Sequence, residues 1–251
     1  MTFKSRVLAT SVILIMLCFY AKPSWAKTAD NVSQANNFYQ NSQYQKAADI
    51  YESLLSSKIE NGHLHYNLGN TYIRMGKKGK AISAYLKAKS LLPRDEDLRA
   101  NLNYAIYETV DKLDWEKSDN SHHLFFWVDA FTLEEHLMIL LIVNLAFWLT
   151  MGIWVYQRNW VMDVARKFLL GALLFTLVAT GFRWQLETHE NYGVVLQKKI
   201  QIRSEANEDR VVLFELHEGA IVKIDAEKNQ WYKITLPNGE TGWVPITAIA
   251  T

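Results

Sequence analysis

The sequence predicts a multidomain membrane protein: an all-α repeat array, a two-helix transmembrane hairpin and a small all-β barrel. Three observations predict this fold class. Similar residue types recur 34 positions apart in the N-terminal part, as they do in stacked helical repeats. Two apolar runs near the middle have the character of membrane spans. Short β-rich runs separated by turn residues fill about the last 60 positions, which indicates a small barrel.

Composition narrows the function before any motif is considered. The 251 residues carry a formal net charge of +1, so there is no electrostatic reason to expect nucleic acid as a partner. Cys18 is the only cysteine, which excludes a disulfide within the chain and a cysteine-based zinc site. The sequence has no GxSxG, HExxH or phosphate-binding glycine motif. We therefore expect no catalytic residues, no metal and no cofactor, and predict that the protein is not an enzyme.

Residues 1–26 have the pattern of a secretory signal peptide. Lys4 and Arg6 supply the positive start, an apolar run follows, and Ser24 and Ala26 occupy the small-residue positions of a cleavage site. An uncleaved anchor is the alternative, and it would leave the following residues on the same side of the membrane. Both interpretations send residue 27 and the adjoining soluble part out of the cytoplasm.

The 34-residue periodicity falls within residues 29–110. It pairs Ala35 with Gly69, Ser42 with Gly76, Ala47 with Ala81, and Tyr51 with Tyr85. The second copy carries the full signature, which consists of Leu68, Gly69, Tyr72, Gly76, Ala81, Tyr85, Ala88 and Pro93. This pattern resembles the tetratricopeptide repeat, in which small residues let two antiparallel helices approach and large residues fill the space beside them. We predict about two repeats and a terminal helix that covers the end of the array.

The resemblance to tetratricopeptide repeats implies a concave groove lined by the first helix of each repeat. The candidate groove residues are Asn36, Tyr39, Gln40, Tyr66, Asn67, Asn70, Ile73 and Arg74. Amides beside aromatic rings suit an extended peptide or a partner helix. Asn36 and Asn67 resemble two amides of the clamp with which some relatives hold a C-terminal carboxylate, but Val32 stands where that clamp has a lysine. For any single residue, a solvated helix face is the alternative interpretation.

A linker at residues 111–135 leads to the predicted hairpin, which consists of a first span at 136–156, a cytoplasmic loop at 157–166 and a second span at 167–186. The first span contains twenty consecutive uncharged residues, which at about 1.5 Å per residue cross roughly 30 Å of hydrocarbon. A buried core helix is the alternative. The second run is weaker, because only fifteen uncharged residues separate Lys167 from Arg183.

The loop of the hairpin gives the predicted topology. Within or beside the loop there is one acidic residue, Asp163, and there are three basic residues, Arg158, Arg166 and Lys167. Because basic residues mark the cytoplasmic side of a membrane protein, the loop is predicted to lie in the cytoplasm. The signal peptide leads to the same arrangement independently. We therefore predict a protein of the bacterial inner membrane with both soluble parts on the extracytoplasmic, periplasmic side.

Residues 192–251 resemble the bacterial SH3 domain. Six short β-rich runs are separated by turn signals, among them Pro237-Asn238-Gly239 between two alternating strands. The positions that carry the resemblance are Arg203, Gly219, Trp231, Gly239, Gly242 and Trp243. The two tryptophans are interpreted as structural, with ligand binding as the alternative. The family resemblance implies peptidoglycan or a neighbouring membrane protein as the ligand.

The order of these parts resembles the BatE family of the Bacteroides aerotolerance (Bat) operon type. That resemblance implies partnership with membrane-anchored von Willebrand factor A-type proteins and with an ATPase of the MoxR type. The leading hypothesis is a membrane-anchored protein–protein interaction scaffold that assembles a Bat-type complex related to aerotolerance or stress. The alternative hypothesis is a cell-wall-binding adaptor that holds peptidoglycan and recruits a peptidoglycan hydrolase.

Overall fold

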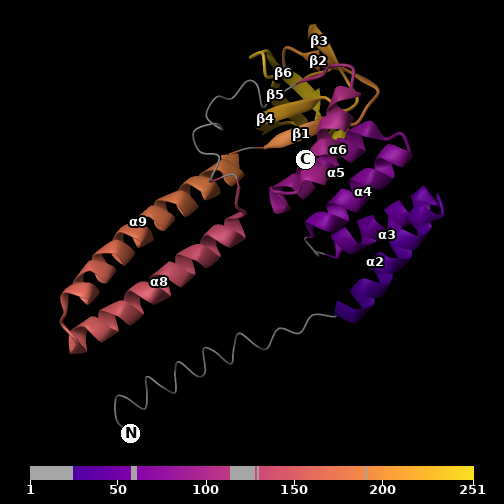
Figure 1. Ribbon diagram of the computed structural model, residues 1–251. Helices are drawn as coiled ribbons and strands as arrows, with labels where there is room; N and C mark the ends of the chain where they lie inside the picture. The colour runs from indigo at the N-terminus through magenta and orange to yellow at the C-terminus, as the bar shows by residue number, and fades with distance from the viewer. Residues whose placement is uncertain (1–24, 58–60, 114–127, 129, 190) are drawn as a thin grey trace.

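The computed structural model describes residues 25–57, 61–113, 128, 130–189 and 191–251. Figure 1 shows a helical array beside a β-sheet, with a pair of long helices projecting away from both. The predicted signal peptide lies outside the described residues, apart from Trp25 and Ala26, which begin the first described helix. Most of the predicted linker also lies outside them.

Five helices form the repeat array. They are α2 (Trp25–Gln40), α3 (Tyr44–Ser56), α4 (Gly62–Arg74), α5 (Lys78–Leu91) and α6 (Glu96–Tyr107). The side chain of Asn61 accepts hydrogen bonds from the first turn of α4, and Asp95 does the same for α6, so both helices begin at a residue that satisfies free backbone N–H groups. Leu98 and Leu102 of α6 are buried against the array. The helix after Pro93 therefore packs against the end of the repeats.

Close packing in the repeats depends on the small residues of the signature. Ala47 and Ala81 are fully buried, and Tyr51 and Tyr85 are each 1% exposed. A β-carbon on Gly69 would lie 2.5 Å from two ring carbons of Tyr85, closer than atoms can pack. Glycine is therefore required where α4 meets the Tyr85 ring.

The turn inside each repeat has the same backbone conformation in both copies. Gly76 has φ of 71°, and Ser42, at the equivalent position 34 residues earlier, has φ of 59°. The left-handed region suits glycine but costs an L-residue about 1–2 kcal/mol. The first repeat therefore keeps the turn with a less suitable residue.

Replacing Ser42 by glycine should raise the free energy of unfolding of the repeats by about 0.5–1 kcal/mol, because relief of the left-handed strain exceeds the added chain entropy. Urea unfolding followed by helical circular dichroism measures the change. The reciprocal Gly76→Ser variant serves as the matched control and should be destabilised. A loss of stability in Ser42→Gly would contradict the strain argument.

Two long helices form the projecting pair. α8 (Leu133–Tyr156) and α9 (Trp160–His189) run antiparallel and side by side (Figure 1). The turn between them is shorter than the predicted loop at 157–166, because the Asn159 side chain accepts a hydrogen bond from Met162 N (2.9 Å) and starts α9 early. The helices also extend beyond the predicted spans at 136–156 and 167–186.

Within the described residues, only α8 is long and apolar enough to cross a membrane, with a mean hydropathy of 2.2 in its most apolar stretch. None of that stretch is buried in the protein. α9 carries Asp163, Arg166, Lys167 and Arg183, which shorten its uncharged length. The first predicted span therefore lies in a suitable helix, whereas the second remains a prediction.

The C-terminal part is an antiparallel sheet in the order β3-β2-β6-β5-β4-β1-β7. The strands are β1 (Tyr192–Val195), β2 (Lys199–Arg203), β3 (Val212–His217), β4 (Ile221–Lys228), β5 (Trp231–Thr235), β6 (Thr241–Pro245) and β7 (Ile249–Ala250). Ile202, Ile234 and Val244 are fully buried in its core. A β-carbon on Gly242 would lie 2.3 Å from the Ile202 side chain, so glycine lets β6 approach β2 closely.

Candidate functional site

The candidate groove contains a hydrogen bond that occurs once in each repeat. Tyr51 donates its hydroxyl proton to Asn36 Oδ1 (2.5 Å), and Tyr85 donates to Asn70 Oδ1 (2.7 Å). The donors are 34 residues apart, and so are the acceptors. Each first helix is therefore joined to its second helix through an asparagine that the sequence assigned to the groove. The amide oxygen of each asparagine thus accepts from the second helix, and the NH2 group is the part of the amide that can donate to a ligand.

A third helix contributes to the same row of amides. Asn101 of α6 donates from Nδ2 to the Tyr66 hydroxyl (2.8 Å) and to Asn70 Oδ1 (3.1 Å). Asn67, on the first helix of the second repeat, interacts with the Tyr51 side chain. Asn101 is absent from the predicted groove residues because that prediction covered only the first helices of the two repeats, although Asn101 lies 34 positions after Asn67. The structure thus brings together amides from α2, α4 and α6.

One end of the groove has a cation next to aromatic rings. Arg74 Nε lies 3.5 Å from the Tyr39 hydroxyl, and the Tyr39 ring packs edge-on against Tyr44 with centroids 5.5 Å apart. Arg74 and Gln40 are exposed, and Ile73 is half-buried against the core. The clamp of some tetratricopeptide relatives has a lysine where this chain has Val32. Here Arg74 supplies a positive charge at one end of the groove.

Burial perturbs the tyrosines that hold the repeats together. It raises the pKa of Tyr51 to about 12, and it raises the pKa of Tyr85 above the ordinary value of 10.0. Burial, followed by the hydrogen bond to Glu52, does the same for Tyr72. Because the pKa of each of these tyrosines is higher in the folded than in the unfolded state, its protonated hydroxyl contributes fully to the free energy of unfolding below pH 10. That contribution is lost as the pH rises through the pKa of the folded state.

The repeats should therefore unfold in alkali between about pH 10 and 12, in step with ionisation of the buried tyrosines. Tyrosinate absorbance and helical circular dichroism, recorded on the same samples, measure both events. The Tyr51→Phe variant removes one ionising group, so its unfolding should depend less steeply on pH. Complete tyrosine ionisation with the helices intact would contradict this expectation.

The repeats and the sheet share an interface. Glu218 Oε1 accepts a hydrogen bond from the backbone N–H of Gly79 in α5 (3.0 Å). Asp111, just beyond α6, accepts from His217 N (2.6 Å) and lies 3.0 Å from His217 Nδ1. Gly219, one of the residues that carried the SH3 resemblance, has φ of 90°, and a β-carbon on it would lie 2.6 Å from Thr109 Cγ2 of the repeat domain.

The sheet has a hollow of about 430 Å³ on its surface, and two of the residues that carried the resemblance, Arg203 and Trp231, line it. Its lining includes Lys199, Arg203, Glu215, Trp231 and Pro245. Lys199 pairs with Glu215 at 2.7 Å and lowers the pKa of that carboxyl. Trp231 is 9% exposed, in keeping with a mainly structural role. The remaining signature residues lie elsewhere: Gly239 has φ of 85° in the turn between β5 and β6, and Trp243 pairs with Arg203 and Lys233 across neighbouring strands.

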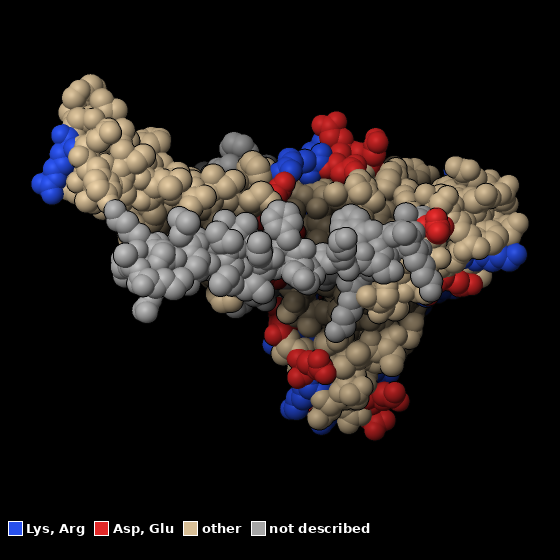
Figure 2. Space-filling model, turned by 90° about the horizontal axis from the view of Figure 1, so that it is seen from below, with Lys and Arg blue, Asp and Glu red and all other residues tan. Residues whose placement is uncertain are grey.

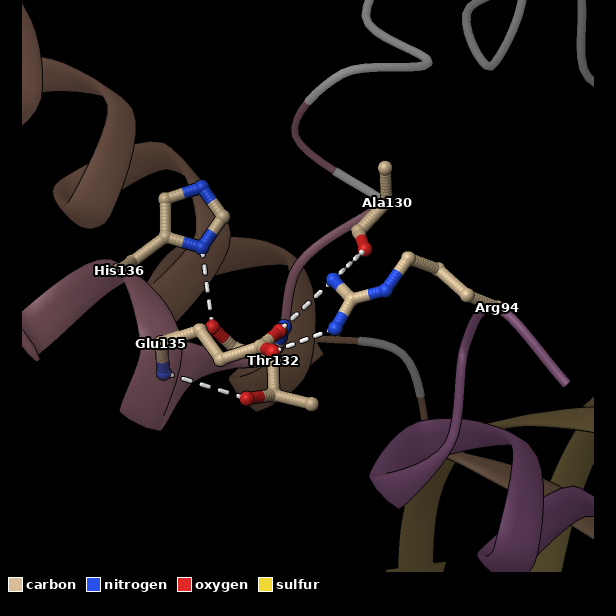
Figure 3. A network of polar contacts seen from close by, with 5 residues as sticks. All are labelled: Arg94, Ala130, Thr132, Glu135 and His136. Atoms are coloured by element: carbon tan, nitrogen blue, oxygen red, sulfur yellow. Dashed lines mark hydrogen bonds and ion pairs between the residues drawn. The ribbon is translucent and has the colours of Figure 1, made fainter. Parts of the chain in front are cut away.

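Arg94 joins the repeats to the start of α8 (Figure 3). Its guanidinium donates to Ala130 O (2.7 Å) and to both carboxylate oxygens of Glu135 (2.5 and 3.0 Å). Thr132 and Glu135 form a reciprocal capping box at the N-terminus of the helix. Because a bidentate arginine–carboxylate pair fixes direction as well as distance, this contact orients the array relative to α8.

Two families match parts of the chain. The tetratricopeptide repeat family matches residues 62–95, and the bacterial SH3 domain family matches residues 197–250. No curated protein matches the chain. These matches confirm the two predicted kinds of domain, while the resemblance to the BatE family remains a hypothesis. The chain therefore combines a tetratricopeptide repeat with a bacterial SH3 domain.

Proposed function

We propose that this protein is a membrane-anchored, non-enzymatic interaction scaffold whose repeat groove binds an extended segment of a partner protein. The row of amides from three helices carries the proposal. Asn36 and Asn70 each accept a hydrogen bond from a tyrosine through Oδ1, and neither NH2 group donates a hydrogen bond to another described residue. Such donors match the carbonyl groups of an extended peptide, and Arg74 suits an acidic group on it.

The helix pair supports membrane attachment. Large apolar side chains are exposed along both helices, including Leu141 (68%) and Leu149 (60%) on α8 and Phe168 (73%) and Val178 (71%) on α9. Exposed apolar surface of this extent calls for a lipid or protein environment. In this proposal both helices cross the bilayer, with α9 completing its span through the stems of its flanking basic residues.

The contact between repeats and sheet supports a single-sided arrangement. The hydrogen bonds Gly79–Glu218 and His217–Asp111 join the two soluble parts, which favours placing both on one side of the bilayer. A helix pair that enters and leaves the membrane provides this arrangement. The basic residues of the turn then favour placing the turn in the cytoplasm and both domains in the periplasm.

Site-specific cross-linking in native membranes tests the groove. A photoreactive residue at Gln40, exposed at the arginine end, should give adducts with a partner protein. The same residue at Lys87, exposed on α5, is the matched control and should give none of these adducts. Arg74→Glu should abolish the Gln40 adducts while preserving helical circular dichroism. Equal adducts at Gln40 and Lys87 would rule out the groove as the binding surface.

The finer proposal is a Bat-type assembly, in which the groove holds membrane-anchored von Willebrand factor A-type proteins. It rests on the order of the parts, which resembles BatE, and on the extracytoplasmic placement proposed above. Mass spectrometry of the Gln40 adducts identifies the partner directly. Recovery of proteins without a von Willebrand factor A-type domain would remove this assignment and leave the scaffold intact.

A cell-wall adaptor is the second candidate, and the hollow on the sheet favours it. Lys199, Arg203 and Glu215 place both signs of charge beside one another, which suits the amines and carboxylates of peptidoglycan stem peptides. The solubilised chain should then sediment with purified sacculi, and Lys199→Glu should weaken sedimentation. Failure of the unaltered chain to sediment would eliminate this candidate.

A further inference from the structure

Residues 154–167 form the end of the helix pair, the hairpin tip. Its centre is Trp154, whose ring lies 4.1 Å from the guanidinium carbon of Arg166 and 5.1 Å from that of Arg158, measured to the ring centroid. Contacts of this kind hold a flexible arginine against a rigid ring. The two guanidinium groups are therefore placed by one indole.

Asp163 completes this arrangement but neutralises only part of its charge. It accepts hydrogen bonds from Trp154 Nε1 (2.9 Å) and Arg166 Nε (3.0 Å). Asp163 is the only acid in the hairpin tip, which has three basic residues. Arg158 and Lys167 are exposed, and neither has an acidic partner among the residues that the structure describes. The tip therefore keeps two cations for an anion from outside the chain.

The hairpin tip is separated from the soluble domains by a length of uncharged surface. Figure 2 shows a blue basic patch at the far end of the helix pair and tan surface behind it. α8 has no charged residue from Leu137 to Tyr156. Tyr156 (86%) and Trp160 (75%) are exposed at the tip, as is usual for side chains in the headgroup layer. If the apolar length crosses a bilayer, the basic patch lies among lipid phosphates.

We propose that the hairpin tip is a binding site for the phosphate of an anionic phospholipid headgroup. Arg158 and Lys167 bind the phosphate, while Trp154 and Asp163 hold the neighbouring arginines in position. A guanidinium held against a ring loses less conformational freedom on binding, and its planar fork matches phosphate oxygens. Charge complementarity identifies the occupant, because lipid phosphate is the abundant anion at this depth. The inference rests on the proposed membrane crossing.

Lipid retention by the purified full-length chain tests the site. The detergent-solubilised protein is titrated with phosphatidylglycerol or with phosphatidylcholine of identical acyl chains, and native mass spectrometry counts the bound lipids. The unaltered chain should prefer phosphatidylglycerol. Neutralising both cations, as Arg158→Gln with Lys167→Gln, should reduce that preference about 25-fold, or roughly fivefold for each basic residue near an anionic lipid.

The matched control neutralises two exposed cations of the repeats, Lys87→Gln with Arg99→Gln, and should preserve the preference. Equal retention of the two lipids by the unaltered chain, or an equal loss in the control, would overturn the proposal. Complete displacement of the lipid by millimolar inorganic phosphate would indicate a general anion site and would also overturn it. Alkaline carbonate extraction distinguishes failure of the proposed membrane anchor from failure of the lipid site. Release of the chain from membranes contradicts the anchor, whereas retention without lipid preference contradicts only the lipid site at the hairpin tip.

Discussion

Replacing Gly69 by alanine should lower the free energy of unfolding of the repeats by about 1–2 kcal/mol. The new methyl group would lie 2.5 Å from two carbons of the Tyr85 ring. That ring cannot move aside easily, because it is 1% exposed and its hydroxyl is bonded to Asn70. Overpacking of a core usually costs about 1–3 kcal/mol, and here the cost exceeds the gain of about 1 kcal/mol in helix propensity. Urea unfolding followed by helical circular dichroism measures the loss.

A second-site change identifies the clash as the cause. Tyr85→Leu alone removes a buried ring and a hydrogen bond, so it should also be destabilising. Combined with Gly69→Ala it removes the atoms that the new methyl group meets. The double variant should therefore lose less than the sum of the two single losses. Strict additivity would show that the close approach of Gly69 and Tyr85 does not limit the packing.

Replacing Gly79 by alanine should separate the repeats from the sheet without weakening either. A β-carbon at Gly79 would lie 2.5 Å from the carbonyl oxygen of Val195 and 3.0 Å from Glu218 Cγ. Alanine is a better helix former than glycine by about 1 kcal/mol, so α5 itself should gain stability. The clash acts between domains, where a small displacement also breaks the Gly79–Glu218 hydrogen bond.

Spin labels at Lys87 and Lys228, both exposed, report the separation as a distance distribution in a Cys18→Ser background. The unaltered chain should give one narrow distribution, and Gly79→Ala a broad one. Ser90→Ala, an exposed position on the same helix, is the matched control and should keep the narrow distribution. A narrow distribution in Gly79→Ala would show that this interface does not hold the domains together.

The repeats could be predicted because small and large residues recur 34 positions apart where the helices pack against each other. Gly69, Ala81 and Tyr85 occupy positions where only a small or a large side chain fits. The sheet could be predicted for a similar reason, since turn residues such as Gly239 separate strands in which apolar and polar residues alternate. Ser42 shows the limit, because its left-handed backbone is visible only by comparison with Gly76.

The contacts between distant parts of the chain could not be predicted in this way. Glu218 meets Gly79 across 139 positions, and Arg94 meets Glu135 across 41. These residues are charged or small and look like ordinary surface positions. The groove was predicted as a set of separate side chains, whereas the asparagines are bonded to tyrosines of the following helix. Only tertiary structure decides which atoms of an amide remain for a ligand.

We propose that a helix hairpin anchors both soluble domains on the same outer face of a membrane. Single cysteines at Asn41, Asn159 and Asn229, all exposed, test it when each is introduced into a Cys18→Ser chain. A maleimide that cannot cross membranes should label the cysteines at 41 and 229 in intact spheroplasts. It should label the cysteine at 159 only after permeabilisation. Labelling at 159 from outside, or protection at 41 or 229, would contradict the claim.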